Sequence, residues 1–278
     1  MIDILLATYN GAQFLEQQLD SIFNQSVSGW RIIAHDDGSN DCTLDILLSF
    51  QSRFPEKLRV IQDNIKFGSA KENFVHLIGY ATADYVMFCD QDDVWLPHKI
   101  EVTYTKMKAI EDKDRHIPCI VHTDLTVVNQ ALEVIHPSMF SYQCLPQTFY
   151  MAHFILVQNF VTGCTMLVNR AAIHCALPVA PSAIMHDWWI AARVLLSGGK
   201  IELIPQATIL YRQHANNSVG SKKITAFYYL KQLTNVKNVF NAYSPVFNQS
   251  KDLGFRCYVC FIFMNAIMIT SRILLCRK

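Results

Sequence analysis

The 278-residue sequence predicts an α/β protein with a mostly parallel central sheet flanked by helices. Three observations lead to this fold. Short, almost continuous apolar runs recur along the first part of the chain, helical patterns separate them, and polar clusters follow several of the runs. Strands that alternate with helices form βαβ units with right-handed crossovers, and continuous apolar runs are typical of parallel strands covered on both faces.

Strands and helices are expected to alternate through this first part. The strands are residues 2–8, 30–36, 58–63 and 84–90. Apolar residues at helical spacing indicate the helices between them, namely Leu15, Leu19, Ile22 and Phe23, then Leu44, Leu47 and Leu48, and then Phe74, Leu77 and Ile78. In such sheets ligands bind outside the carboxyl ends of the strands, which is where the clusters TYNG, DDGSND and DQDD fall.

The rest of the chain has a mixed pattern. We expect residues 160–173 to be a strand that runs into a helix, residues 186–196 a helix, and residues 201–211 a closing strand. No internal repeat or low-complexity linker interrupts the sequence, so one domain boundary is placed near Gly220. It separates a domain of residues 1–220 from a basic and apolar helical region of residues 221–278.

The C-terminal region combines positive charge with apolar character. Residues 221–278 contain nine Lys and Arg residues and one acid, a net charge of +8 against −7 for residues 1–220. The uncharged run of residues 257–271 is shorter than the ~20 residues needed to span a bilayer. We favour a helix that lies in the interface of an anionic membrane, while a buried helix, a partner interface and a true span stay open. Nucleic acid is not an expected partner, because the chain carries no nucleic-acid-binding signature.

The cysteines indicate the compartment. There are nine, an odd number, and the chain opens on MIDILLATYN without a basic segment or a cleavage site. This pattern favours a reduced, cytoplasmic setting. Cys257 and Cys260 have the spacing of half a zinc site, but no second pair lies near them in the sequence.

The stretch CDQDDVWLP, residues 89–97, contains an unusual concentration of like charge. Asp90, Asp92 and Asp93 follow an apolar run and repel one another unless positive charge lies among them. Asp90 and Asp92 stand two residues apart where a strand ends, so both can turn toward one point, and their oxygens suit Mg²⁺ or Mn²⁺. The loop after the first strand has neither the GxGxxG of a dinucleotide site nor a P-loop.

A second acidic pair, Asp36 and Asp37, ends the second predicted strand before Gly38. A carboxylate in this position can accept hydrogen bonds from a ribose hydroxyl or a base N–H. The alternative is structural: Asp37 begins an Asx turn, and Ser39 or Asp41 caps the next helix.

Several segments, taken in order, resemble the family 2 glycosyltransferases of the GT-A fold. They are ATYNGAQFLEQQLDSI, DDGSNDCT, DQDDVWLPHKI, TGCTMLVNR, HDWW and YRQHANNSVG. The resemblance covers residues 1 to about 220 and is closest in character to bacterial rhamnosyltransferase-like enzymes of polysaccharide assembly. It implies a Rossmann-like GT-A domain, followed here by a membrane-associating helical appendage, and an inverting sugar transfer from a nucleoside diphosphate sugar.

The resemblance also implies roles on the donor side. Thr8, Tyr9 and Asn10 would border the nucleotide, and Asp37 would contact the base. Asp92, the last residue of the DxD triplet, would bind the metal ion that bridges the diphosphate, with Asp90 close by in the nucleotide-sugar site. Mn²⁺ or Mg²⁺ is the expected cofactor.

The catalytic base implied by the resemblance is Asp187 of HDWW. A helix start stabilises its charge, and Trp188 and Trp189 can exclude water, although a structural helix acid above a tryptophan core is the alternative. One of the two tryptophans is expected to stack on an acceptor sugar. In YRQHANNS, Arg212 is expected to clamp the diphosphate and His214 to serve as an extra metal ligand.

The expected function is therefore a metal-dependent inverting glycosyltransferase at the cytoplasmic, inner face of the cell membrane. Its acceptor would be a glycan or a lipid-linked oligosaccharide in capsule or O-antigen synthesis. A deoxythymidine diphosphate rhamnose donor is favoured over UDP-hexoses, and Asp124 would line the donor sugar. The competing hypotheses are a non-catalytic glycan-binding or scaffold protein that keeps the fold, and a nucleotidyltransferase, which would need a glycine-rich, arginine-containing first loop.

Overall fold

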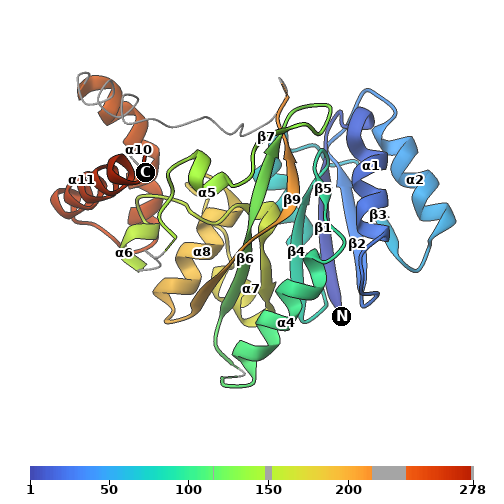
Figure 1. The fold of residues 1–278 in the computed structure, drawn as a ribbon, viewed down its shortest axis with the longest axis horizontal. Helices are drawn as coiled ribbons and strands as arrows, with labels where there is room; N and C mark the ends of the chain where they lie inside the picture. Colours follow the sequence, from blue (N-terminus) through green and yellow to red (C-terminus); the bar gives the residue numbers. More distant parts are fainter. Residues whose placement is uncertain (115, 148–151, 215–235, 277–278) are drawn as a thin grey trace.

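A computed structural model describes residues 1–114, 116–147, 152–214 and 236–276 (Figure 1). Within these residues the chain forms one nine-stranded sheet in the order β3-β2-β1-β4-β8-β6-β9-β5, with β7 paired to β6. The strands are β1 (Ile2–Thr8), β2 (Trp30–Asp36), β3 (Leu58–Ile61), β4 (Tyr85–Asp90), β5 (Val94–Trp95), β6 (Cys119–Val128), β7 (Val134–His136), β8 (Leu167–Asn169) and β9 (Lys200–Arg212). The domain boundary predicted near Gly220 lies outside the described residues.

The sheet is mostly parallel, as the sequence predicts. Strands β1 to β4 are parallel to one another, and β9 is parallel to β6. The short strand β8 lies between β4 and β6 and is antiparallel to both, while β5 and β7 are antiparallel to β9 and β6. The β1, β2 and β4 boundaries agree with the sequence prediction to within one residue.

Helices cover both faces of the sheet (Figure 1). They are α1 (Ala12–Phe23), α2 (Thr43–Arg53), α3 (Ala70–Ile78), α4 (Lys99–Glu111), α5 (Met139–Tyr142), α6 (Ala152–Ile155), η1 (Gly163–Thr165), α7 (Arg170–Ala176), α8 (His186–Leu196), α10 (Val236–Asp252) and α11 (Tyr258–Leu275). Because side chains alternate along a strand, Ile4 and Leu6 join the core with α1, α2 and α4, while Leu5 joins the core with α3, α7 and α8.

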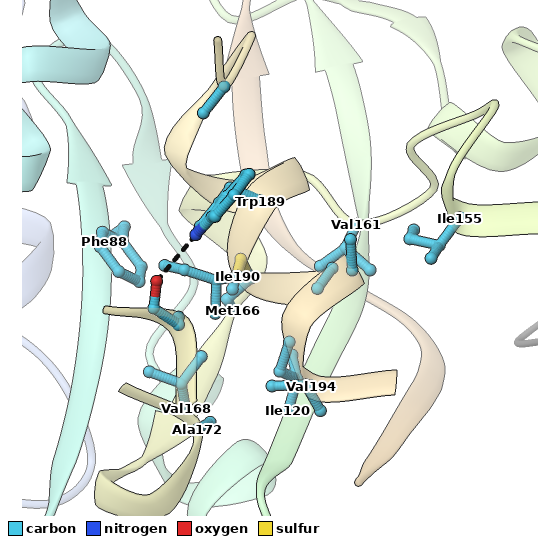
Figure 2. Close-up of a cluster of buried hydrophobic side chains, with 14 of the residues drawn as sticks. Phe88, Ile120, Ile155, Val161, Met166, Val168, Ala172, Trp189, Ile190 and Val194 are labelled. Carbon is cyan, nitrogen blue, oxygen red and sulfur yellow. Dashed lines mark hydrogen bonds between the residues drawn. The ribbon is translucent and has the colours of Figure 1, made fainter. Parts of the chain in front are cut away.

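Trp189 lies within the second of these cores (Figure 2). Its indole N–H donates a 2.7 Å hydrogen bond to the carbonyl oxygen of Ala176, which satisfies the one polar atom that the ring brings into an apolar interior. This contact joins α8 to the end of α7. Truncation of such a buried tryptophan to alanine costs about 3–5 kcal/mol.

The parallel register brings the predicted functional loops together. Thr8 at the end of β1 pairs with Asp36 at the end of β2, and Ala7 pairs with Asp90 at the end of β4. The three loops that follow these strands therefore leave the same edge of the sheet side by side.

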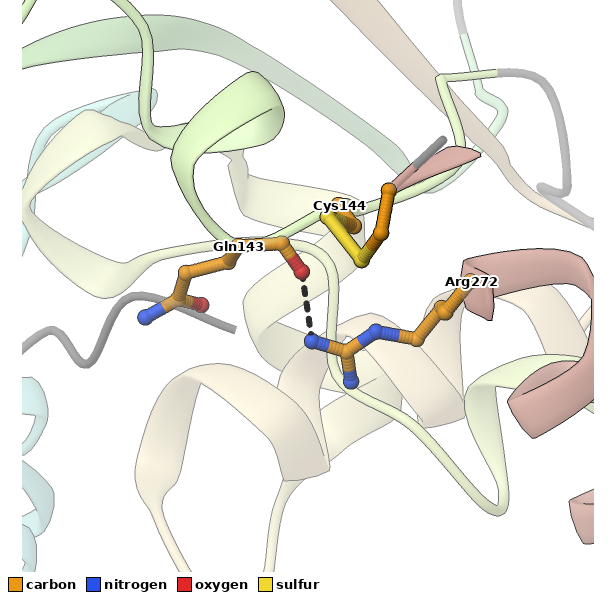
Figure 3. The surroundings of a disulfide bond; sticks show 4 residues. Gln143, Cys144 and Arg272 are labelled. Carbon is orange, nitrogen blue, oxygen red and sulfur yellow. Dashed lines mark hydrogen bonds between the residues drawn. A yellow bond between two sulfur atoms is a disulfide. The ribbon is translucent and has the colours of Figure 1, made fainter. Parts of the chain in front are cut away.

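The C-terminal helix α11 packs against the body of the protein through one face. Phe261 and Met268 are buried in the core that contains α8. Arg272 donates to the carbonyl oxygen of Gln143 at 2.7 Å, beside a disulfide between Cys144 and Cys276 (Figure 3). The expectation of reduced thiols is wrong for this pair in the structure, and their separation of 132 residues gives no signal in the sequence.

The opposite face of α11 carries exposed apolar side chains, among them Ile262, Phe263 and Leu274. Within the parts of the chain that the structure describes, no helix is long and apolar enough to cross a membrane.

Candidate active site

A cavity of about 320 Å³ opens at the edge of the sheet where β1, β2 and β4 end. Its size falls in the range of small-molecule sites. The residues that line it are Ala7, Thr8, Tyr9, Asp37, Gly68, Ser69, Ala70, Asn73, Phe74, Asp90, Gln91, Asp92, Met185 and Tyr211. Five of the residues predicted from the sequence are thus part of one cavity, and the start of α3 provides a wall that the sequence reasoning did not include.

Tyr9 is held at the mouth of this cavity by Gln91. The backbone N–H of Tyr9 donates to Gln91 Oε1 at 2.8 Å, and Gln91 Nε2 donates back to the Tyr9 carbonyl oxygen at 2.8 Å. The phenol ring is half exposed, so a flat face is presented to ligands. Asn10 lies outside the cavity lining, and its Oδ1 accepts from the N–H of Asn40. A contact of Asn10 with the nucleotide stays a prediction.

Asp36 and Asp37 have different surroundings. The Asx turn, which the structural alternative placed at Asp37, is formed by Asp36, whose carboxylate accepts from the N–H groups of Gly38 and Ser39. Gly38 has a φ of +80°, which favours glycine. Asp37 faces the cavity and accepts from the N–H of Phe67 at 2.5 Å, so it also holds the loop before α3.

The acidic triplet divides into two cavity residues and one buried residue. Asp90 and Asp92 line the cavity, whereas Asp93 is fully buried beneath it. Burial raises the pKa of Asp90 to about 7, and the charges of Asp92 and Asp187 add to this shift. Burial raises the pKa of Asp93 well above its ordinary value, with repulsion from Asp92 and Asp90 adding to it. The cavity therefore carries an excess of negative potential at its floor.

His214 and Arg212 both reach the DxD loop from the end of β9. His214 Nε2 lies 2.7 Å from Asp92 Oδ2, so the two predicted metal ligands are neighbours. Arg212 Nε donates to the carbonyl oxygen of Asp92 at 2.8 Å, and its backbone N–H donates to Asp93 Oδ1 at 3.1 Å. The guanidinium is 2% exposed and braces the loop from below. A direct contact of Arg212 with the diphosphate stays a prediction.

Asp187 occupies the first turn of α8, as predicted, and is 8% exposed. Burial raises the pKa of this carboxyl to about 6, although hydrogen bonds from the Trp188 N–H, the Gly163 N–H and the Asn159 side chain act in the opposite direction. Asp187 is not among the residues that line the cavity, although its charge adds to the raised pKa of Asp90, which does line it. Asp187 thus has the basicity that a general base needs near neutral pH.

Two partners of Asp187 were not identified as functional from the sequence. Gly163 donates its N–H to Asp187 Oδ2 at 2.9 Å, and a Cβ at this glycine would lie 3.1 Å from His186 Nε2. Asn159 uses its Oδ1 to accept from the N–H of Val161, which leaves its amide group to donate to Asp187. Gly163 lies in the quoted segment TGCTMLVNR, but no motif marks Asn159.

Trp188, Trp189 and Asp124, which the sequence singled out, bind other parts of the same chain. Trp188 is half-buried and donates its indole N–H to the Ile155 carbonyl oxygen at 2.5 Å, while Trp189 belongs to the core. Asp124 is buried and accepts from the N–H of Met139 at 3.0 Å and from the hydroxyl of Ser138. It therefore holds the start of α5, and the expectation that it lines the donor sugar finds no support in the cavity lining.

A mostly parallel sheet with a ligand cavity at its strand ends, a DxD loop on the cavity floor and a buried basic carboxylate nearby defines a glycosyltransferase of the GT-A type. The chain belongs to glycosyl transferase family 2, whose family model matches residues 3–173. Among curated proteins it is similar to the dTDP-rhamnosyl transferase RfbG of Shigella flexneri. The two are 28% identical over 268 residues, which cover 88% of this chain and 87% of RfbG.

Solved glycosyltransferase structures share the fold. S. aureus TarS 1–349 in complex with UDP-GlcNAc matches with a TM-score of 0.59 at 16% identity, over 82% of this chain and 63% of that chain. The mannosyltransferase PcManGT from Pyrobaculum calidifontis, in complex with GDP-Man and Mn²⁺, matches with a TM-score of 0.58 at 13% identity. That match covers 99% of this chain and 73% of PcManGT. At these identities the likeness concerns the fold alone.

Proposed function

We propose that this chain transfers a sugar, with inversion, from a nucleoside diphosphate sugar to a hydroxyl of a glycan or a lipid-linked acceptor. The observation that carries the proposal is one cavity at the strand ends that is lined by Asp90, Gln91 and Asp92 and by Met185, which leads into the helix that carries Asp187. A donor whose diphosphate lies on the DxD loop brings its anomeric carbon toward Asp187. A single displacement then needs a base on the face opposite the leaving group.

The residues on the cavity floor fit a divalent cation. Asp92 Oδ2 and His214 Nε2 are 2.7 Å apart, and Asp90 lines the same cavity as Asp92, so a cation bound there would lie among oxygen and nitrogen ligands. Carboxylate oxygens with one imidazole suit Mn²⁺, and carboxylate oxygens with water suit Mg²⁺. Asp92 and His214 would hold the ion, and its chemistry there is to neutralise the charge that develops on the leaving diphosphate.

The chain's own residues bind and orient both substrates. Tyr9 offers its exposed ring to the base, and Asp37 accepts from the base or the ribose. Asp187 takes the proton from the attacking hydroxyl as the new glycosidic bond forms and the bond to the diphosphate breaks. Its hydrogen bonds from Gly163 and Asn159 fix the carboxylate, while Trp188 and Trp189 restrict water on its far side.

The donor that we propose first is deoxythymidine diphosphate rhamnose, because the chain is similar along 88% of its length to a dTDP-rhamnosyl transferase. The test is slow donor hydrolysis without acceptor, measured for dTDP-rhamnose, UDP-glucose, UDP-galactose and UDP-GlcNAc with Mn²⁺ or Mg²⁺. The proposal expects Mn²⁺- or Mg²⁺-dependent release of dTDP above that of UDP. Release of UDP alone would assign another donor, and no release from any donor would favour a non-catalytic glycan-binding protein.

We also propose that the acceptor is met at the inner face of the cell membrane, within the synthesis of a surface polysaccharide. Two features support a membrane surface as a partner. The exposed face of α11 carries Ile262, Phe263, Ile267 and Leu274, and the region from residue 221 onward has a net charge of +8. Apolar insertion and attraction to anionic headgroups then act together.

A further inference from the structure

A polar cluster lies outside the cavity, at the ends of β2 and β3. His35 Nε2 lies 3.1 Å from Asp63 Oδ1, and His76 Nε2 lies 2.6 Å from Asp63 Oδ2. The imidazole nitrogens and one carboxylate oxygen all lie within 4.8 Å of one another. His35 comes from β2, Asp63 from the segment after β3, and His76 from α3, so three separate segments converge.

The ring of His35 is oriented by a partner behind it. His35 Nδ1 lies 2.8 Å from Asn73 Oδ1, and Asn73 Nδ2 donates to the His35 carbonyl oxygen at 3.3 Å, which fixes the amide orientation. The Nδ1 therefore donates, and the Nε2 is directed at the cluster. Metal-bound histidines have this arrangement, in which the second ring nitrogen donates to a fixed acceptor.

One carboxylate thus faces two imidazole nitrogens, each from a different segment of the chain. A metal ion binds carboxylate oxygens and imidazole nitrogens in their deprotonated forms.

We propose that His35, Asp63 and His76 form a second metal site, suited to Zn²⁺ and separate from the site at Asp92. Two imidazoles and one carboxylate are a common three-ligand set for zinc, with a water molecule in the fourth position. Zinc–ligand bonds of about 2.0–2.2 Å place tetrahedral ligands about 3.3 Å apart. The separations of 3.1 and 2.6 Å run to the two different oxygens of Asp63, and the three ligand atoms lie within 4.8 Å of one another. The ring of His76 is partly exposed and is the ligand that would move to complete the site.

Such an ion would brace the wall of the donor cavity. Asn73, which orients His35, also lines the cavity, and Ser69 and Ala70 at the start of the same helix line it too. His35 also lies only two residues before Asp37, the residue predicted to contact the nucleotide base. Zn²⁺ would join β2, the segment after β3 and α3 in one cross-link, so its binding should raise the melting temperature.

The test uses full-length protein stripped with a chelator, in a background carrying Asp92→Asn and Cys257→Ser. These changes weaken two competing sites, the DxD loop and the exposed thiol pair. Calorimetric titration with Zn²⁺ should give one equivalent that the cluster variants lose, and Zn²⁺ should raise the melting temperature. Adding His76→Asn should lower the affinity at least about 100-fold, since loss of an outer partner alone costs 10–100-fold. Asp63→Asn should act in the same way.

His174→Asn in the same background is the matched control, because His174 is exposed on α7, away from the cluster. It should leave stoichiometry and affinity unchanged. Circular dichroism checks that each variant folds, and only folded variants are compared. The proposal is overturned if the background protein binds no Zn²⁺, or if His76→Asn and Asp63→Asn both bind it with unaltered affinity.

Discussion

Asp90, Asp92 and Asp93 lie within four residues of chain and yet differ in what their carboxyls can do. Asp92 faces the cavity beside His214, whereas Asp93 is fully buried with a pKa well above its ordinary value. Asp93 is not among the residues that line the cavity, so it offers no oxygen to an ion bound there. The sequence shows the cluster but not this division, because the direction of each side chain depends on how the loop leaves β4.

This difference predicts opposite outcomes for two conservative substitutions. Asp92→Asn removes a charged ligand and should abolish Mn²⁺- or Mg²⁺-dependent donor hydrolysis. Asp93→Asn keeps a buried oxygen that accepts from the Arg212 N–H and changes no residue of the cavity lining, so activity should stay within about threefold. Metal titrations of donor hydrolysis measure both. Equal loss in the two variants would contradict the assignment of Asp92 as the ligand.

A second residue-scale prediction concerns the pH dependence of transfer. The pKa of Asp187 is raised to about 6, chiefly by burial, and a base works only when it is deprotonated. The rate should therefore rise with pH through about 6 and level off above it. Asp187→Asn should lower kcat by about 10²–10⁴-fold and remove this limb of the profile. A variant that keeps the wild-type limb would show that another group is the base.

The sequence could predict most of the individual site residues, because strand ends in a parallel sheet meet at one edge. It could not predict the contacts that orient them. Gln91 fixes Tyr9 through both of its amide atoms, and Asn159 donates to Asp187. These pairs are joined by tertiary packing, and neither Gln91 nor Asn159 is marked by a charge or a spacing that signals a role.

At the scale of elements, α11 is connected to Asp187, the proposed base, through a chain of polar contacts. Arg272 Nη1 donates to Gln158 Oε1 at 2.6 Å, and Gln158 Nε2 donates to the Asn159 carbonyl oxygen at 2.8 Å. The side chain of Asn159 donates to Asp187. The C-terminal helix therefore supports the loop that holds Asp187.

This connection predicts that Arg272→Met lowers the rate of donor hydrolysis several-fold and shifts the pH limb assigned to Asp187, because the loop around residues 155–163 loses its support. Arg272→Lys should restore only part of the rate, since an ammonium lacks the planar fork that reaches Gln143 and Gln158 together. Arg256→Met is the control, because Arg256 is exposed. If the pH dependence of the rate is the same in Arg272→Met as in the wild type, Arg272 has only a structural role.

Element boundaries followed the sequence closely where periodicity was strong. Helix α8 spans His186–Leu196 as predicted, and β9 extends the predicted closing strand by one residue at each end. The insertion of β8 between β4 and β6 could not be predicted, because a strand of three residues carries too little pattern to specify its neighbours.

On the scale of the whole molecule, the exposed face of α11 and the basic C-terminal region predict binding to anionic vesicles. Phe263 is 67% exposed, and Phe263→Glu places a charge in the centre of the apolar face. We expect the wild-type protein to sediment with vesicles that contain phosphatidylglycerol and the variant to stay in solution, while both hydrolyse donor equally.

Val134→Glu is the matched control, since Val134 is 62% exposed on β7, in another part of the molecule. It should sediment like the wild type. Equal sedimentation of Phe263→Glu and the wild type, or no sedimentation of either, would contradict binding of this face to a membrane. Helix α11 would then only support the loop that holds Asp187.

The most direct test of the central claim is a crystal structure with dTDP and Mn²⁺, collected to record the anomalous scattering of manganese. We predict an anomalous peak next to the carboxylate of Asp92, with the diphosphate beside the manganese ion and the thymine ring between Tyr9 and Asp37. An ordered nucleotide bound elsewhere, or a fully loaded crystal with no manganese at Asp92, would contradict it.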